Sequence, residues 1–567
     1  MYDILVRGGE VVDGSGRPRV KADVGIVGER IAAIGDLSGA EATRVIDASG
    51  RVITPGFIDV HTHIDAQVFW DSTVSPSPLH GVTTVIAGNC GFSVQPLSND
   101  PADGDYLIRM LSRVEGMPLA SLLEGAPWDW VSTADYLDAL EHRLSVNAAF
   151  KVGHSALRRV VMGAACTQRT ATPEEVQQMC DLLRAGIQAG AIGFSSSWST
   201  THNDTEQNMV PSRYADRDEM IALCSVLADF PGTSLEFIPC IGPFGQAEVD
   251  LMADMSLAAK APLNWNVLPV NERNREFVEG KLAASDAAAA RGAKVVGLTA
   301  PMALDFRLSF SHGFLLDAVP GWEAPMLLPH EEKKALLADP ERRKALGDLA
   351  AKEHMMRHFT HWSQMIIFYT VAPENAGYVG RRIGEIADEL GKTPWDTICD
   401  ISLADDLRTS FGHPSVDEPD ATWQARVDVW RDPRAIIGAS DAGAHLDMFF
   451  SADYATRLLG EAVVKRKLLP LEEAVHYITQ VPAELYQLRD RGRVREGAFA
   501  DLVVLDEHTV SSNPMDMRAD LPGGAARLYA EANGIDHVLC NGREIVSHGV
   551  FTDERPGTIL RTGVHTG

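Results

Sequence analysis

The sequence predicts an α/β protein built around a (β/α)8 barrel, with one small β-domain assembled from both ends of the chain. Two observations support this prediction. The middle of the chain alternates short apolar strands with helices, and the strands number eight, the count that such a barrel requires. The first fifty residues and those after about 492 instead alternate short β-branched runs with Gly, Asp and Asn turns, which is typical of consecutive antiparallel strands.

The eight predicted barrel strands are short apolar runs, most of which end in polar residues. In chain order they are GFIDVHTH (56–63), GVTTVIAGNC (81–90), NAAFKVGH (147–154), AIGFSSSW (191–198), TSLEFIPC (233–240), APLNWNVLPV (261–270), AKVVGLTAP (293–301) and RAIIGASDAGAH (434–445). Helices are expected between them. The stretch TPEEVQQMCDLLRAGIQAG, for example, has a capping residue at Thr172 and a proline at the first helical position, Pro173.

The predicted domain boundaries lie where the strand-and-turn pattern of the chain ends gives way to alternating strands and helices. The connection from about 302 to 433 is too long for one crossover, so it should hold an insertion. Each chain end is small for a stable sheet domain, and one domain built from both is the simpler expectation because termini often lie close together. Asn541-Gly542 predicts a hairpin in the C-terminal part. We therefore predict a β-domain from residues 1–54 and 481–567 and a barrel over residues 55–480.

Composition and charge exclude several classes of function. The formal net charge of −27 argues against binding to a phosphate backbone, which needs clustered Lys and Arg. We find no secretory signal and no apolar run of the roughly 20 residues that a membrane helix needs, so we expect a cytoplasmic protein that binds neither nucleic acid nor membrane. The 7 cysteines have no regular spacing, which argues against a disulfide framework.

Two histidines end the first predicted strand. His61 and His63 are separated by one residue, and residues i and i+2 of a strand point to the same side. Active sites of such barrels collect at the C-terminal ends of the strands, and neutral imidazole is a good zinc ligand. His61 and His63 are therefore candidate metal ligands, with a pair of surface or packing histidines as the alternative.

Two more strand ends carry candidate groups. Cys90 ends the second strand, where a thiolate could be a further metal ligand, although a buried Cys is often only a small core residue. Asp441 follows the last strand, which lies beside the first once the barrel closes. A carboxylate there could contact both a metal and a water, accept the proton of the attacking water and pass it to the leaving group. Asp441 could also be only a turn residue or a helix cap.

The motifs around these residues resemble the amidohydrolase superfamily and, more narrowly, the N-acyl-D-amino-acid deacylase (D-aminoacylase) family. The matching stretches are ITPGFIDVHTHID, HGVTTVIAGNCGFS, VGHSALR, AGAIGFSSSW, GASDAGAH and DRGRVREGAFADLVVLD. The resemblance spans residues 1 to about 550. It implies a distorted TIM-like barrel with a composite β-sandwich domain, zinc as the metal, and hydrolysis of N-acyl amino acids. It also implies that His61, His63 and Cys90 are metal ligands and that Asp441 is the catalytic acid/base next to the metal.

The sequence departs from this family at two strand ends. The family places a zinc-binding histidine at the end of each of strands five and six, but neither of these strands contains a histidine here. Strand five offers Glu236, a possible oxygen ligand, and strand six offers Asn264 and Asn266, whose amides are weak zinc ligands. His202 and His445, on loops just past strand ends, are candidates to replace the missing ligands. We therefore expect one Zn2+ ion, and a second site is in doubt.

Other polar residues near strand ends are candidates for contact with a substrate. His154 could stabilise an oxyanion or bond a backbone carbonyl, and Arg158 could pair with a substrate carboxylate. Ser196 and Glu236 are further candidates for substrate binding. Lys151 lies inside an apolar strand, where a carbamylated bridging lysine must be considered, but it is on strand three rather than strand four.

The favoured function is a metal-dependent amidase that cleaves a linear amide of an N-acyl amino acid, with Asp441 as general acid/base. A cyclic amide hydrolase of the hydantoinase or dihydroorotase kind is the nearest alternative, but those enzymes usually hold two metals around a carbamylated lysine. A catalytically silent binding protein is the other alternative; the missing histidines favour it, and intact His61, His63 and Asp441 oppose it. The expected partner is a small-molecule amide, and the insertion could cover an interface in a homo-oligomer.

Overall fold

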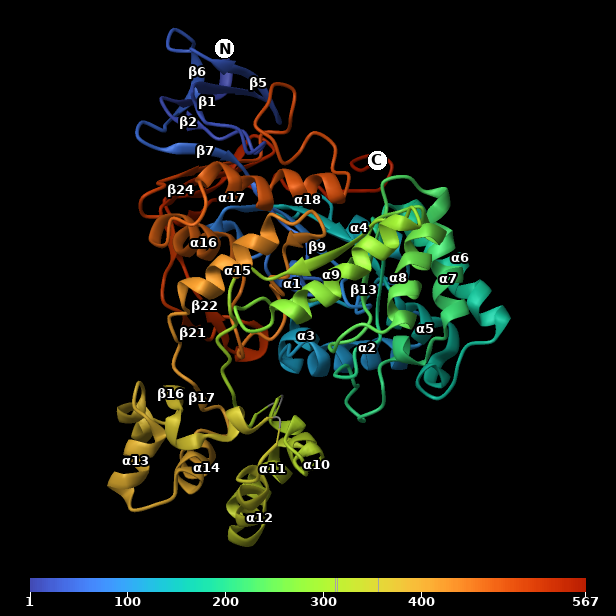
Figure 1. Cartoon of the computed structure of the whole chain (residues 1–567), viewed down its shortest axis with the longest axis vertical. Helices are drawn as coiled ribbons and strands as arrows, with labels where there is room; N and C mark the ends of the chain where they lie inside the picture. The colour runs from blue at the N-terminus through green and yellow to red at the C-terminus, as the bar shows by residue number, and fades with distance from the viewer. Residues whose placement is uncertain (312, 314, 355) are drawn as a thin grey trace.

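The computed structural model describes residues 1–311, 313, 315–354 and 356–567. It has a large body and a smaller lobe that projects from it (Figure 1). The N-terminal strands lie at the end of the body opposite the lobe (Figure 1). Among the described residues, no helix combines the length and the apolar character needed to cross a membrane.

All eight predicted barrel strands are present, and they bond in parallel along the chain order. They are β8 (Phe57–Asp59), β9 (Val82–Ala87), β10 (Asn147–Phe150) with its continuation β11 (Val152–Gly153), β12 (Gly193–Ser197), β13 (Ser234–Ile238), β14 (Leu263–Trp265), β15 (Val295–Thr299) and β18 (Ala435–Ile437). The third strand is broken at Lys151, which divides the set into sheets β8–β10 and β11–β18. A further parallel bridge joins Thr62, beyond β8, to Ala442, beyond β18. The segments that follow the first and last strands therefore lie side by side.

Helices pack against these strands and bury their apolar faces. The helices of the body are α1 (Gln67–Trp70), α2 (Pro101–Val114), α3 (Leu119–Gly125), α4 (Thr133–Leu140), α5 (His154–Met162), α6 (Pro173–Ala189), α7 (Arg217–Val226), α8 (Gln246–Ala259), α9 (Arg275–Ala290), α15 (Asp420–Trp430), α16 (Tyr454–Leu458), α17 (Leu471–Ile478) and α18 (Gln480–Leu485). Helix α6 begins as the sequence predicts, because Thr172 caps it and Glu175 completes a capping box. Its buried Leu183 and Ile187 pack in one core with Phe237 of β13.

Strands from both ends of the chain form one sheet. A seven-stranded sheet contains β2 (Glu10–Val11), β3 (Val20–Lys21), β7 (Val52–Pro55), β19 (Leu502–Leu505), β24 (Ile535–Cys540), β25 (Arg543–Ser547) and β26 (Val550–Phe551). A four-stranded sheet contains β1 (Tyr2–Arg7), β4 (Asp23–Val27), β5 (Arg30–Gly35) and β6 (Ala42–Asp47), and residues of both sheets share one apolar core. The predicted hairpin joins β24 to β25, where Asn541 and Gly542 have φ values of 45° and 72°, as a type I′ turn requires.

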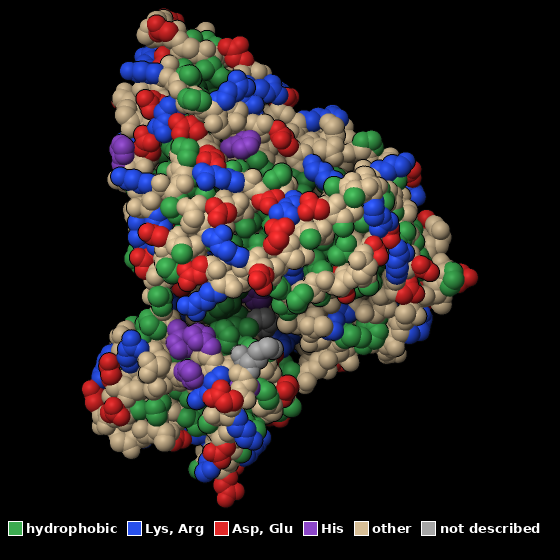
Figure 2. Space-filling view, viewed as in Figure 1, with side chains coloured by type: hydrophobic (Ala, Val, Ile, Leu, Met, Phe, Trp, Pro, Cys, Tyr) green, Lys and Arg blue, Asp and Glu red, His purple; other side chains and the backbone are tan. Residues whose placement is uncertain are grey.

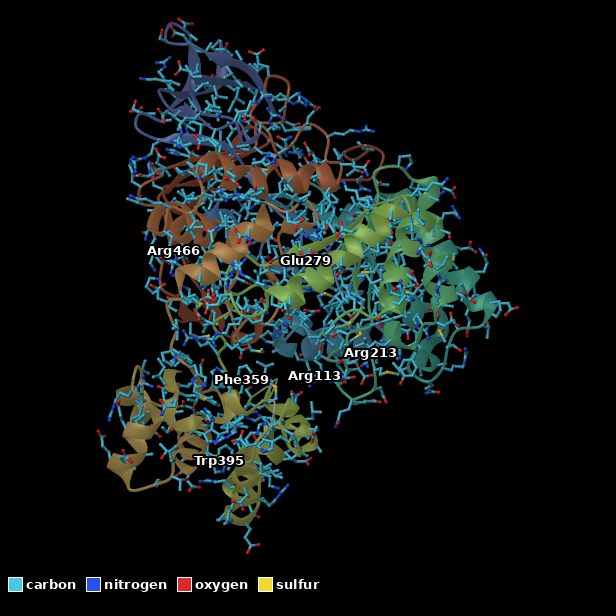
Figure 3. The ribbon with its side chains drawn as sticks, in the orientation of Figure 1. Arg113, Arg213, Glu279, Phe359, Trp395 and Arg466 are labelled. Atoms are coloured by element: carbon cyan, nitrogen blue, oxygen red, sulfur yellow. The ribbon has the colours of Figure 1, made fainter. Side chains whose placement is uncertain are left out.

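The long connection between β15 and β18 contains the lobe. Its main elements are α10 (Glu323–Leu327), α11 (His330–Ala338), α12 (Pro340–Ala350), α13 (Ile383–Leu390), α14 (Pro394–Ala404), β16 (Ile366–Tyr369) and β17 (Ser410–Gly412). The lobe has its own core, in which Trp322, Trp362 and Trp395 pack with ring centroids 5.2–6.0 Å apart. Arg113 of α2 pairs with Asp317 of the lobe, and Figure 3 shows Arg113 on the side of the body that is turned to the lobe. Figure 2 shows a hollow between the two parts, with histidine side chains gathered at its rim.

Candidate metal centre and active site

His61 and His63 follow β8 and lie in the interior of the body. Their side chains are 3% and 1% exposed, and their ring centroids are 5.2 Å apart. The segment is held by the loop after β18: the N–H of His63 donates to the carbonyl of Ala442 at 2.8 Å, and the N–H of Asp441 donates to the carbonyl of His61 at 3.1 Å. The two Nε2 atoms face one point, as the i, i+2 spacing predicts.

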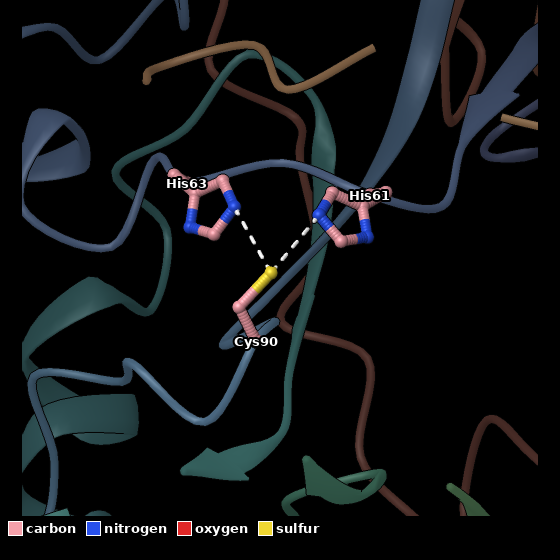
Figure 4. Close-up of side chains that lie close together, drawn as sticks. All are labelled: His61, His63 and Cys90. Atoms are coloured by element: carbon pink, nitrogen blue, oxygen red, sulfur yellow. Dashed lines mark hydrogen bonds between the residues drawn. The ribbon is translucent and has the colours of Figure 1, made fainter. Parts of the chain in front are cut away.

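Cys90 lies at that point. It follows β9 with a left-handed backbone, φ 56°. Its Sγ lies 3.5 Å from Nε2 of His61 and 3.8 Å from Nε2 of His63, and Figure 4 shows both rings directed at the sulfur. Burial and the charges of nearby carboxylates raise the pKa of the thiol well above its usual value. The thiolate form therefore needs a cation beside it.

Asp441 reaches the same point from the loop after β18. Its Oδ1 lies 3.1 Å from Nε2 of His61 and 3.6 Å from Nε2 of His63. The loop is anchored to β8 by Ser440, whose hydroxyl donates to Asp59 at 2.6 Å. The Asp441 side chain is 33% exposed, whereas the histidines are almost inaccessible. The open side of the group is therefore the side of Asp441.

The distances among these donor atoms fit one zinc ion. Atoms bonded to a tetrahedral zinc at about 2.0–2.3 Å lie roughly 3.3–3.8 Å from one another. The two Nε2 atoms lie 3.5 and 3.8 Å from the Cys90 sulfur and 3.1 and 3.6 Å from Oδ1 of Asp441. The close group of donor atoms consists of His61, His63 and Cys90, and Asp441 lies beside it. Imidazole, thiolate and carboxylate are all donors that zinc accepts. His61, His63 and Cys90 could hold one zinc, and Asp441 contacts both imidazoles on the exposed side, where water or substrate could approach.

The charges in the group also favour a cation. Burial would raise the pKa of Asp441, but hydrogen bonds from His61 and His63 hold it well below its usual value. Burial lowers the pKa of His61 to about 4. Burial would also lower the pKa of His63, but the carboxylates of Glu115 and Asp441 outweigh it and raise that pKa to about 9. The environment of His63 thus favours a positive charge in a site that is shielded from water. The same environment would stabilise a metal cation.

Glu115 belongs to this group, and the sequence analysis does not identify it. It is the residue after α2, and its Oε2 lies 3.5 Å from Nε2 of His63 in a side chain that is 4% exposed. Burial raises its pKa to about 7. Glu115 follows a helix rather than a barrel strand, so no strand-end pattern marks it. Only the packing of α2 brings it to the site.

The predicted substrate residues on strands three and four form a separate buried network. Nδ1 of His154 lies 2.9 Å from the hydroxyl of Ser196, and Nε2 lies 2.8 Å from a carboxylate oxygen of Glu219 on α7. Arg158, which is fully buried, donates to both oxygens of Glu219. Both ring nitrogens of His154 thus have protein partners, and neither is free for an oxyanion. The predicted roles of His154, Ser196 and Arg158 stay predictions, and these contacts favour a structural role that ties α5 to α7.

The strand ends that lack the family's histidines hold a second set of polar side chains. Glu236 on β13 is fully buried and accepts the N–H of Cys90 at 2.6 Å. The side-chain amide of Asn266 donates to Glu236 and lies 3.0 Å from Nδ1 of His61. Substrate binding by Glu236 also stays a prediction, and its burial does not favour it. Instead, Glu236 and Asn266 hydrogen-bond Cys90 and His61, the candidate metal ligands.

The two loop histidines do not replace the missing ligands in this structure. Nδ1 of His202 lies 2.9 Å from the hydroxyl of Ser197. Burial and the neighbouring His445 and His63 lower the pKa of His202 to about 3. Among the described residues, neither His202 nor His445 belongs to the close group of donor atoms at the site.

Comparisons with known proteins agree with this geometry. The sequence pattern described as the amidohydrolase family matches residues 44–339 and 362–546. The D-aminoacylase of Alcaligenes xylosoxydans xylosoxydans is 31% identical over 572 residues, which cover 99% of this chain and 97% of the relative. The N-acyl-D-glutamate deacylase of the same organism is also 31% identical, over 99% of this chain and 96% of the relative.

Solved structures give the same result. A D-aminoacylase described as having a binuclear metal centre, with one-metal activation and second-metal attenuation, is 27% identical with a TM-score of 0.64, covering 99% of this chain and 100% of that chain. The N-acyl-D-glutamate deacylase from Bordetella bronchiseptica, solved with zinc and a phosphonate that mimics the tetrahedral intermediate, is 25% identical with a TM-score of 0.65 and the same coverage. The resemblance found in the sequence is confirmed, and the chain belongs to the amidohydrolase family.

Proposed function

We propose that this protein is a zinc-dependent hydrolase that removes the acyl group from an N-acyl-D-amino acid. The observation that carries the proposal is the convergence of His61, His63 and Cys90 on one point, with Asp441 in contact with both imidazoles on the side that opens to solvent. Membership of the amidohydrolase family supports hydrolysis of an amide. The full-length similarity to a D-aminoacylase and an N-acyl-D-glutamate deacylase supports a linear amide and the D configuration.

The fold proposed for this enzyme is a distorted, closed (β/α)8 barrel with a β-sandwich domain. The parallel order of the eight strands and the bridge from Thr62 to Ala442 support closure between the first and last strands. The common core of the two sheets at the chain ends supports one sandwich domain, which we assign to residues 1–54 and 481–567. The barrel would then occupy residues 55–480, with the lobe as its insertion around 302–433.

The proposed mechanism rests on the different exposure of the site residues. When bound by His61, His63, Cys90 and Asp441, zinc would supply Lewis acidity and make a water molecule more acidic. Asp441, ionised and one-third exposed, accepts the proton of the attacking water at Oδ1 or Oδ2 and then donates it to the leaving nitrogen. The buried histidines would hold the metal in place and take no part in proton transfer, because solvent and substrate cannot reach their rings. The carboxyl group of Glu115 lies against His63 and would orient its ring.

An amine-release assay tests this proposal. Metal-loaded protein is given N-acyl amino acids of D and L configuration and, separately, hydantoins. We expect turnover of N-acyl-D-amino acids that is lost on chelation and restored by zinc. Turnover of hydantoins without turnover of linear amides would favour the cyclic amide alternative. Loaded protein that hydrolyses none of these amides would favour the silent binding protein.

A further inference from the structure

A second polar cluster lies beside the metal group, at the ends of the strands from β9 to β14. Its side chains are buried, and its members are Asn89, Lys151, Glu236, Asn264, Asn266 and Tyr486. The cluster touches the metal group at two points: Glu236 accepts the N–H of Cys90 at 2.6 Å, and the Asn266 amide lies 3.0 Å from Nδ1 of His61. This is also the side where the family places the histidines of strands five and six.

Lys151 enters this cluster as a hydrogen-bond donor. Its Nζ, in the break between β10 and β11, donates to Oδ1 of Asn89 at 2.6 Å. The orientation of the Asn89 amide is fixed independently, because its Nδ2 donates to the carbonyls of Thr62 and Ile86 at 3.0 Å each. Asn89 therefore offers only its oxygen to Lys151. The ring of Tyr486, with its centroid 5.1 Å from Nζ, adds a cation–π contact.

Glu236 provides the opposite charge. Burial lowers the pKa of Lys151 to about 8, and the Glu236 carboxylate is the main charge that opposes this shift. Burial likewise raises the pKa of Glu236 to about 7, and the charge of Lys151 is the main one that opposes it. Both side chains are 0% exposed, and buried charges in proteins are normally compensated by an opposite charge. Both oxygens of Glu236 already have donors, namely the backbone N–H of Cys90 and the side-chain amide of Asn266.

The amide groups of strand six are engaged with protein partners as well. The hydroxyl of Tyr486 donates to Oδ1 of Asn264 at 2.8 Å, and Nδ2 of Asn264 lies 3.2 Å from Oδ1 of Asn266. In the part of the chain that the structure describes, no three His, Cys, Asp or Glu ligand atoms converge within this second cluster. With Lys151 in place, the cluster therefore offers no preformed set of metal ligands.

We propose that the Lys151 ammonium replaces the second metal ion of the binuclear centre described for D-aminoacylase, so that this chain holds one metal ion only. Lys151 is held by Asn89, and the Glu236 carboxylate accepts from Cys90 and Asn266 behind the first metal site. A dication in the same dry region would be repelled by the ammonium. The inference rests on the proposed metal site, but not on the proposed substrate.

Metal counting tests the inference without any measurement of activity. The metal-free full chain is equilibrated with excess zinc, freed of unbound metal by dialysis, and analysed by elemental mass spectrometry. We expect one zinc per chain. Two zinc ions per chain in the unaltered protein would overturn the inference and leave the proposed function intact. No bound zinc would overturn the proposed metal site itself, and the inference with it.

Removal of the ammonium should open the second position. In Lys151→Gln, an N–H donor for Asn89 remains but the positive charge is lost, so a dication near the Glu236 carboxylate is no longer repelled. We expect the affinity for a second zinc to rise by about 100-fold or more, which calorimetric titration would measure. Lys151→Met is the second variant should the first fail to fold.

A buried lysine elsewhere is the matched control. Lys281 is 1% exposed and donates only to the carbonyls of Cys240 and Ile241. We expect Lys281→Met to bind one zinc, as the unaltered chain does. A folded Lys151 variant that still takes up no second zinc would show that the ammonium does not exclude the metal, and would overturn the inference.

Discussion

Polar side chains at strand ends form both halves of the site, but they bond differently in the two halves. At the ends of β8, β9 and β18, polar side chains leave their strongest donor atoms directed at one point: the Nε2 atoms of His61 and His63, the sulfur of Cys90 and the carboxylate of Asp441. At the ends of β13 and β14, the polar side chains bond each other and Lys151 instead.

On the proposed assignment, a family scaffold loses one metal position without losing the other. A strand end in a barrel places a side chain near the centre, but only the identity of its neighbours decides whether the lone pairs stay available. His63 keeps its Nε2 for a cation because two carboxylates surround it. Glu236, at an equivalent depth, has both oxygens satisfied by N–H donors. Burial at a strand end therefore does not by itself make a metal ligand.

The largest effect is expected at the exposed member of the metal group. Asp441→Asn removes the proton acceptor, and we expect kcat to fall by about 1000-fold or more, since general acid–base catalysis contributes roughly 100- to 10,000-fold. Thermal stability should stay close to that of the unaltered protein, and activity is measured with zinc in excess, so that weaker zinc binding does not account for the fall. Asp305→Asn, at a side chain 27% exposed outside the metal group, is the control and should keep full activity. An Asp441→Asn protein with activity within tenfold of normal would contradict the assignment.

The next effect concerns the residues that the sequence suggested for the substrate. Arg158→Ala leaves Glu219 buried without its guanidinium, and we expect the free energy of unfolding to fall by about 3–5 kcal/mol. Denaturant titration would measure this change. KM should not change, because Arg158 is fully buried. A higher KM with unchanged stability would instead indicate that Arg158 binds the substrate.

The third effect separates a ligand cysteine from a core cysteine. Cys90→Ala should weaken zinc binding by at least about 100-fold, because even residues behind the ligands change metal affinity by roughly 10- to 100-fold. Cys399 is also a buried free cysteine, but it lies in the core of the lobe. Cys399→Ala should leave zinc affinity unchanged. Equal effects of the two substitutions on zinc affinity would show that Cys90 acts only through packing.

The smallest effect is expected at Glu115. Glu115→Gln keeps the size of the side chain but removes its negative charge beside His63, so zinc affinity should fall by about tenfold. The exposed Glu124 on α3 is the control, and Glu124→Gln should change nothing. Unchanged zinc affinity in Glu115→Gln would mean that the carboxylate of Asp441 alone sets the charge at His63.

The sequence predicted those parts of the site that depend on local periodicity. Alternation along a strand places His61 and His63 on one side, and the rule that barrel sites collect at strand ends singles out Cys90 and Asp441. Glu115 escaped prediction because a helix, not a strand, carries it to the site. The sequence also could not show that Glu219 satisfies both His154 and Arg158, because that contact depends on how α5 packs on α7.

In the fold, too, local sequence signals predicted the individual elements, whereas contacts between distant segments were harder to predict. Eight strands, the helix after Thr172 and the hairpin at Asn541-Gly542 follow from apolar runs, a cap and a turn signal, all of which are local. The pairing of β7 with β19 joins segments from opposite ends of the chain. It was expected only because both ends have the same pattern of short β-branched runs and turns. The packing inside the lobe had no such signal. Its three clustered tryptophans come from distant parts of the insertion.

The most direct test of a single-metal amidase is the activity of the metal-free chain on an N-acyl-D-amino acid as zinc is added stepwise. We predict that activity rises in proportion to zinc and reaches its maximum at one equivalent, with no further rise at a second. Activity that appears only after the second equivalent, or no activity at any zinc level, would contradict the account.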